Sequence, residues 1–291
     1  MDLVSQAPRE VPSQVTLTPP PHLILVPETP LWNLPLREIW EYRELLLFMA
    51  WRDVKVRYRQ TVLGATWAIV QPLTAMVIFS IVFGQLAKLP SDGIPYPIFT
   101  YTALLPWNLF AGALTRATSS LVGNAHLLTK VYFPRVIIPV SAMVSSVIDF
   151  GVSFVILLGM MLYYGIEPTW RLAALPFLLL LAFVAALGVG LWLSALNVRY
   201  RDVSYIIPFL IQVWLYASPV AYSSTLIPTQ WRWLYGLNPL VGVIEGFRWA
   251  LLGTSWQPDI LVLLSVVIVM VTFVTGLLYF HRMEETFADV A

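Results

Sequence analysis

Long runs of apolar residues without charge are the feature that most constrains this chain. From residue 172 to residue 196 the sequence contains no Asp, Glu, Lys or Arg. A helix needs about 20 mostly apolar residues to cross the roughly 30 Å hydrocarbon layer of a bilayer. The whole chain is 58% hydrophobic and 11% charged, whereas soluble domains are typically about 45–50% apolar and 25% charged. We therefore predict an all-α integral membrane protein.

Runs of sufficient length predict six transmembrane helices, at about residues 61–86, 98–121, 136–164, 172–196, 203–222 and 258–280. The stretch 223–257 is interrupted by prolines and tryptophans, yet it contains the apolar segment NPLVGVIEGFRWALLG. We expect one or two short re-entrant or interfacial helices there, before the last span. Glu245 and Arg248 in this segment are three residues apart, so they can pair on one helix face at the outer edge.

The first 60 residues differ from the membrane domain that we assign to residues 61–291. Residues 1–36 are rich in proline and predict a disordered cytoplasmic tail, although a docking segment for another protein is an alternative. Residues 37–60 predict an amphipathic helix that lies in the membrane interface. An ordinary surface helix is the alternative, but the basic cluster directly before the first span favours the interface: Arg52, Lys55, Arg57 and Arg59.

The distribution of Lys and Arg predicts the orientation. With the N-terminus inside, the cytoplasmic side holds thirteen of the 17 Lys and Arg residues and the outer side holds four. Because positive residues concentrate on the cytoplasmic side of membrane proteins, both termini are predicted to be cytoplasmic.

The sequence lacks the patterns expected of an enzyme. It has no cysteine, its three lysines do not belong to a nucleotide-binding phosphate loop, and its three histidines lack zinc-ligand spacing. We therefore predict no catalytic, cofactor or metal residues in this chain, which would not hydrolyse ATP alone. Asp149 lies within a predicted span, where a charge is costly, and we expect it to pair with a neighbouring helix or protomer.

A basic and aromatic segment, NAHLLTKVYFPRVIIP, separates the second and third spans on the cytoplasmic side. It predicts a short helix ended by Pro134, with Lys130 and Arg135 directed outward. Its apolar residues are expected to be partly buried: Leu127, Leu128, Val131, Tyr132 and Phe133. Such a helix suits a contact with a soluble partner, and a plain connecting loop is the alternative.

Several blocks in order over residues 37–291 resemble the ABC-2 type permeases that export O-antigen, capsule and teichoic-acid polysaccharides. The blocks are VKVRYRQTVLGATWAIVQPL, LPWNLFAGAL, NAHLLTKVYFPRVIIP, ALNVRYRDV, SPVAYS and LNPLVGVIEGFRWALL. The N-terminal tail is longer than the start of many members.

The resemblance implies a permease homodimer with two separate ATPase subunits, which bind ATP and Mg²⁺. The segment 124–135 would be the coupling helix, with its contact residues drawn from Asn124, His126, Leu127, Leu128, Lys130, Tyr132, Phe133 and Arg135. A cytoplasmic gate facing the ATPase or lipid phosphates would be formed by Arg52, Lys55, Arg57, Tyr58 and Arg59.

The resemblance further implies a lipid-linked glycan substrate, membrane lipids as neighbours, no nucleic acid, and a place in the bacterial inner membrane. Aromatic rings stack on the flat C–H faces of sugars, so candidates for the translocation path are Phe79, Phe83, Tyr101, Trp107, Phe110, Trp214 and Tyr216.

Three other readings stay open. One is an ATP-independent lipid flippase or secondary transporter, and another is an ABC-2 exporter of a small molecule. The short loop AKLPSDGIPYP between the first two spans disfavours the small-molecule exporter, because such permeases often carry a large outer loop there. A membrane-embedded glycosyltransferase or phosphotransferase would need paired acidic residues of the DxD or DDxxD kind, which the sequence lacks.

Overall fold

The computed structural model describes residues 40–59, 64–128, 133–254, 260–284 and 287. Within these ranges the chain forms helices and turns, and the described part contains no strand. The proline-rich tail lies outside the described residues. The main helices are α2 (Arg43–Arg59), α3 (Gly64–Phe79), α4 (Tyr96–Gly123), α5 (Ala125–Leu128), α6 (Ile137–Tyr163), α7 (Leu175–Arg199), α8 (Val203–Ala217), α9 (Arg232–Tyr235), α10 (Pro239–Leu252) and α11 (Ile260–Glu284).

Four shorter helical segments complete this order. The π-helix η1 (Ser80–Leu86) continues α3, and the 3₁₀ helix η2 (Trp170–Ala174) leads into α7. Two further 3₁₀ helices, η3 (Ser224–Leu226) and η4 (Thr229–Trp231), lie between α8 and α9.

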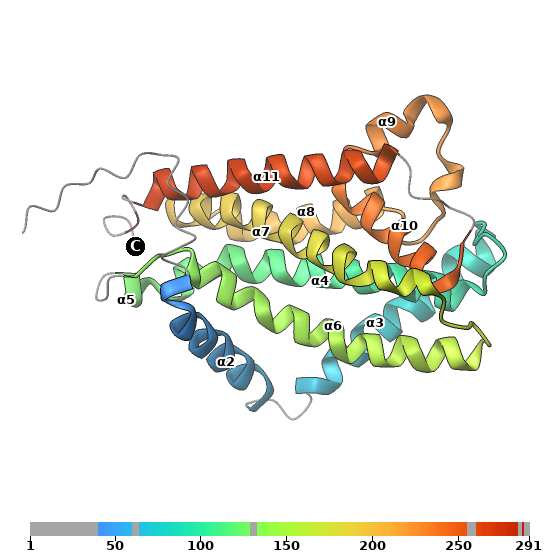
Figure 1. Cartoon of the computed structure of the whole chain (residues 1–291), viewed down its shortest axis with the longest axis horizontal. Coiled ribbons are helices and arrows are strands. Elements are labelled where there is room, and N and C mark those ends of the chain that lie inside the picture. Colours follow the sequence, from blue (N-terminus) through green and yellow to red (C-terminus); the bar gives the residue numbers. More distant parts are fainter. Residues whose placement is uncertain (1–39, 60–63, 129–132, 255–259, 285–286, 288–291) are drawn as a thin grey trace, which may run out of the picture. The chain divides into compact units, whose positions relative to one another are not determined.

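Helix α4 is the centre of the packing. It contacts α6 and α7 along much of its length and also touches α3 and α10, while α11 packs on the other side of α7. Figure 1 shows these long helices running side by side, with α5 and the last turn of α11 at one end and α9 at the other. We call these the α5 end and the α9 end.

Small residues allow α7 and α11 to approach closely. A Cβ atom added to Gly188 of α7 would lie 2.8 Å from the Phe273 backbone of α11. One turn further along, the rings of Trp192 and Tyr279 stack with centroids 4.1 Å apart. Close backbone contact at small residues is a common basis of helix association in membranes, where the hydrophobic effect contributes little between helices.

The described part of the chain is all-helical, as expected, and four of the helices within it are long and apolar enough to cross a membrane: residues 66–86, 137–163, 170–199 and 262–284. The six-span count is not confirmed, because α4 and α8 do not meet both criteria. Helix α4 has 28 residues, but it carries buried polar side chains such as Thr100, Thr118 and Ser120. Helix α8 is apolar but has only 15 residues, about 22 Å at 1.5 Å per residue.

The expected interfacial helix corresponds to α2, whose apolar residues fall on two sides rather than in one stripe. Met49, Ala50 and Val54 are buried, on a helix that packs on α6. Leu47 and Trp51 of the same helix are exposed. The helix therefore binds the bundle through one face and presents apolar side chains on another, as a helix at a bilayer surface would.

Helix α10 is the most deeply packed of the shorter helices. Its first turn is capped by the Asn238 side chain, which accepts a hydrogen bond from the Leu240 backbone N–H at 3.1 Å. It ends at Gly253, whose φ of +69° is in the left-handed region that favours glycine. Nearly every residue of α10 is buried, in contact with α4, α7 and α11.

Candidate functional site

A cluster of charged residues joins three helices toward the α5 end. The Asp149 carboxylate of α6 lies 2.7 Å from Arg116 Nη2 of α4 and 2.8 Å from Arg57 Nη2 of α2. The Tyr58 hydroxyl donates a hydrogen bond to Asp149 at 2.6 Å, and Arg116 Nε donates to Ser146 at 3.0 Å. Burial and the bond to Asp149 raise the pKa of Tyr58 to about 12, which keeps its hydroxyl protonated as a donor.

The expectation that Asp149 pairs with a neighbouring helix is therefore correct. Its partners were not predicted from the sequence. Arg116 lies inside the predicted span 98–121, and no role was predicted for it. Two guanidinium groups face one carboxylate, so the cluster carries a formal charge of +1.

A cavity of about 440 Å³ lies beside this cluster. Its described lining comes from α2, α3, α4, α6 and α8, and two of the wall residues are prolines inside helices, Pro72 of α3 and Pro208 of α8. Besides the charged residues, side chains that can form hydrogen bonds line it: Gln71, Asn108, Thr115, Ser146 and Ser153. A polar, positively charged cavity among apolar helices can accept an anionic or hydroxyl-rich ligand.

The residues expected at the cytoplasmic gate divide into three groups. Arg57 and Tyr58 reach the Asp149 cluster, whereas Lys55 and Arg59 are exposed. Arg52 pairs with Asp53 at 2.8 Å and also donates to the Asn124 side chain at 3.1 Å. The α2 helix thus contacts both the cavity and the start of the segment predicted to couple to the ATPase.

Only part of the predicted coupling segment is described. His126 is exposed on α5, and Asn124 caps the end of α4 by donating to the Ser120 carbonyl at 2.9 Å. Leu127 packs against the apolar cluster around α11. Lys130, Val131 and Tyr132 lie outside the described residues, and nothing is described of the Leu128 side chain.

Arg135 was expected to point outward, and this expectation is wrong. Its guanidinium donates to the Glu284 carbonyl at the end of α11, and its backbone N–H donates to the Glu284 carboxylate at 3.0 Å. Phe133 was expected to be partly buried and is 6% exposed. The C-terminal part of the segment therefore anchors the chain to α11.

Three of the seven aromatic path candidates lie in the interior of the bundle. Tyr101, Trp107 and Phe110 of α4 are each at most 3% exposed, and the Tyr101 hydroxyl donates to the Ser153 carbonyl at 3.2 Å. They do not line an open surface in this conformation, because their side chains are packed in the interior and none of the three lines the cavity. Because the sequence around these residues is apolar, the sequence alone could not distinguish a buried position from a position in the translocation path.

The other four candidates lie nearer a surface. Phe79 and Phe83 form an edge-to-face pair with centroids 5.3 Å apart. Trp214 packs edge-on against Phe110 at 4.9 Å, and Tyr216 is exposed.

Glu245 and Arg248 form a buried pair beside the α9 end. Arg248 Nη1 lies 3.3 Å from Glu245 Oε1, and the guanidinium sits 3.6 Å from the Phe99 ring centroid. Arg248 also donates to the carbonyls of Val220 at 3.0 Å and Tyr222 at 3.3 Å. This arginine holds the SPVAYS turn against α4 and α10, which is a structural role.

Comparison with known proteins identifies the family. Residues 44–252 match the family profile described as ABC-2 type transporter. The chain is 31% identical over 254 residues to the O-antigen export system permease protein RfbA of Myxococcus xanthus, a match that covers 86% of this chain and 96% of the relative.

Two other relatives are also named as export or transport proteins. A Klebsiella pneumoniae protein of the same name is 28% identical over 85% of this chain and 95% of its own length. The polysialic acid transport protein KpsM of Escherichia coli is 24% identical over 80% of this chain and 91% of its own length. The family profile covers well over half of the chain, and a relative above 30% identity matches most of it, so this chain belongs to the ABC-2 type transporter family.

Proposed function

We propose that this chain is the membrane subunit of an ATP-driven exporter that moves a lipid-linked polysaccharide from the cytoplasmic to the outer face of the bacterial inner membrane. The observation that carries the proposal is the match over nearly the full length of permeases named for O-antigen export. A polysialic acid transport protein is matched over most of its length as well. The working unit would be a homodimer with two ATPase subunits, which supply ATP hydrolysis.

In this proposal the α5 end is cytoplasmic and the α9 end is outer. The exposed surface of α5, around His126, would contact the ATPase. The link from Arg52 to Asn124 connects α2 with the junction between α4 and α5. The links from Arg57 and Tyr58 to Asp149 connect α2 with the cavity wall. Movement of α5 would therefore be transmitted to the cavity through α2 and α6.

The cavity would receive the head of the lipid-linked glycan. Guanidinium groups bind phosphate with directional hydrogen bonds, and the cluster carries more positive than negative charge. The amide and hydroxyl side chains of Gln71, Asn108 and Thr115 offer hydrogen bonds to sugar hydroxyls.

The experiment is deletion of the gene in the native host, with immunoblotting of surface glycan before and after complementation. We expect loss of surface glycan, accumulation of lipid-linked glycan inside, and recovery with the wild-type chain. Unchanged surface glycan would reject the proposal and favour export of another compound.

The role of the cavity is tested by Arg116→Gln in the same assay. We expect at least a tenfold loss of export with the dimer still assembled, because the cavity loses one of its two guanidiniums. Arg201→Gln is the matched control, since Arg201 is exposed before α8 and does not line the cavity. Equal export by the two variants would remove Arg116 from the substrate site.

A further inference from the structure

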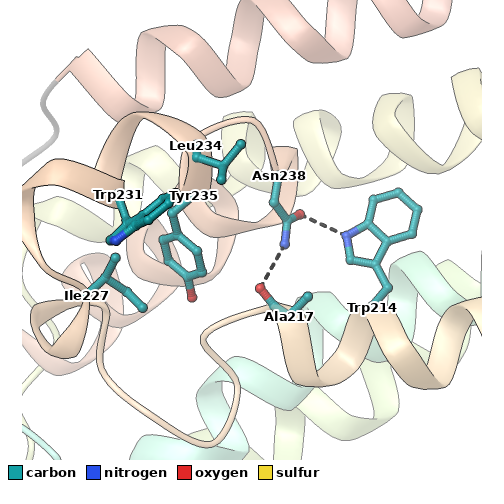
Figure 2. A pocket seen from close by; sticks show the side chains of 7 residues that line it. All are labelled: Trp214, Ala217, Ile227, Trp231, Leu234, Tyr235 and Asn238. Atoms are coloured by element: carbon teal, nitrogen blue, oxygen red, sulfur yellow. Dashed lines mark hydrogen bonds between the residues drawn. The ribbon is translucent and has the colours of Figure 1, made fainter.

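A second cavity, of about 320 Å³, lies toward the α9 end between the end of α8 and the segment around α9. Trp214 and Ala217 come from α8, and the opposite wall is formed by Ile227, Trp231, Leu234, Tyr235 and Asn238. Figure 2 shows the rings of Trp231 and Tyr235 together on one side, with Trp214 on the other. Aromatic rings thus form both sides of this outer pocket.

Hydrogen bonds fix the wall of the outer pocket. Asn238 accepts from the Trp214 indole N–H at 2.9 Å, and its amide donates to the Ser218 hydroxyl at 2.9 Å and to the Ala217 carbonyl at 3.4 Å. The Tyr235 hydroxyl donates to that of Tyr222 at 3.2 Å. Because these bonds join α8 to the start of α10, the pocket exists before any ligand arrives.

One ring of the outer pocket remains accessible. Trp231 is 53% exposed, so much of its indole surface can contact a ligand. Among the residues that the structure describes, no Lys, Arg, Asp or Glu lines the pocket, which argues against a phosphate or another charged group as its ligand. Flat aromatic rings and little charge suit the C–H faces of a sugar, which stack on indole without requiring one pattern of hydroxyls.

The outer pocket and the charged cavity follow one another along α8. Pro208 and Ile211 line the charged cavity, and Trp214 and Ala217 line the outer pocket. From Pro208 to Ala217 the helix rises about 13 Å, and at 3.6 residues per turn its side chains change direction by about half a turn. A polymer that moves along α8 toward the α9 end, passing partly around the helix, would therefore leave the polar cavity and meet the aromatic pocket next.

We propose that the outer pocket is a binding subsite for one or two sugar rings of the exported glycan, with Trp231 as the stacking platform. This proposal rests on the proposed function, since it requires a glycan to pass along α8. The volume lies at the lower end of the roughly 300–1,000 Å³ found for ligand pockets, in keeping with a small part of a polymer. Weak binding is expected, because each segment of the polymer must leave for the next to enter.

The test is saturation-transfer NMR on the purified permease in lipid nanodiscs. The probe is a set of oligosaccharides released by mild acid from the surface glycan of the native host. We expect transfer to sugar ring protons in the wild type and at least a fivefold smaller transfer in Trp231→Ala. Trp233→Ala is the matched control, because Trp233 is 62% exposed two residues away and does not line the pocket.

The outcomes separate this proposal from the proposed function. Equal transfer in Trp231→Ala and wild type, or no transfer in the wild type, overturns the sugar subsite while the deletion assay still supports export. The absence of transfer in the wild type would favour a lipid chain as the occupant of the outer pocket. Unchanged surface glycan after deletion rejects the proposed function, and the subsite with it.

Discussion

At the scale of single residues, Asp149 shows what the sequence predicts and what it leaves open. A carboxylate inside an apolar run must find a partner, so pairing could be expected from its position alone. The identity of the partners could not, because Arg116 and Arg57 are 33 and 92 positions away and meet Asp149 only when α2, α4 and α6 pack. The same holds for Arg248, whose local partner Glu245 was expected but whose carbonyl partners come from distant turns.

Removing the Asp149 charge should destabilise the bundle. In Asp149→Asn, two guanidiniums face each other without a counter-charge, and Tyr58 loses a charged acceptor. We expect the free energy of unfolding to fall by about 1–3 kcal/mol, less than for a fully buried pair because the cluster is partly exposed. Thermal unfolding of the variant and the wild type in nanodiscs measures this loss of stability. Asp202→Asn is the control at an exposed aspartate, and an equal effect there would refute the role of the cluster.

Replacing Arg248 by lysine should also be costly. The Arg248 side chain is fully buried and donates to the carbonyls of Phe99, Val220 and Tyr222 as well as facing Glu245. A lysine ammonium cannot reproduce the forked N–H donors of the guanidinium. We therefore expect the free energy of unfolding to fall by about 2–4 kcal/mol. Arg232→Lys on exposed α9 should leave the unfolding temperature unchanged. A stable Arg248→Lys protein would mean that the turn is held by other contacts.

At the scale of elements, hydropathy predicted the lipid-facing helices best. The four helices that meet the length and hydropathy criteria were all expected, because lipid contact demands an apolar surface. Helix α4 is mostly buried and partly lines the charged cavity, so it tolerates Thr, Ser and Arg that lower its hydropathy. The face of α2 that docks on α6 was not predictable, since both sides of that helix carry apolar residues.

Helix α5 should contact the ATPase. The chain has no cysteine, so His126→Cys gives a single site for a maleimide-benzophenone crosslinker. We expect light-dependent crosslinking to the ATPase from this site and none from Tyr163→Cys, which is exposed at the opposite end of α6. In spheroplasts, a membrane-impermeant maleimide should label only Tyr163→Cys. Crosslinks from Tyr163→Cys instead would reverse the proposed orientation.

At the scale of the whole molecule, the exposed apolar surface around the charged cavity suggests how the two copies of the proposed homodimer would meet. The cavity is lined by α3 and α8, and these helices expose large side chains that include Trp67, Val77, Tyr205, Phe209 and Val213. A hydrophilic polymer next to such a surface must be kept from lipid. Two copies related by a two-fold axis, the commonest symmetry of homodimers, would close the path if these faces met.

The arrangement of the dimer is tested by Phe209→Cys. Phe209 is 65% exposed in the middle of α8, next to Pro208 of the cavity lining. If the α8 faces meet, a short bis-maleimide should convert most of this variant to a species of twice the mass. Val155→Cys on α6 is the matched control at 67% exposure and should stay monomeric on a denaturing gel. The reverse pattern would place the dimer contact at α6, and the charged cavity would then face lipid, where a glycan path cannot run.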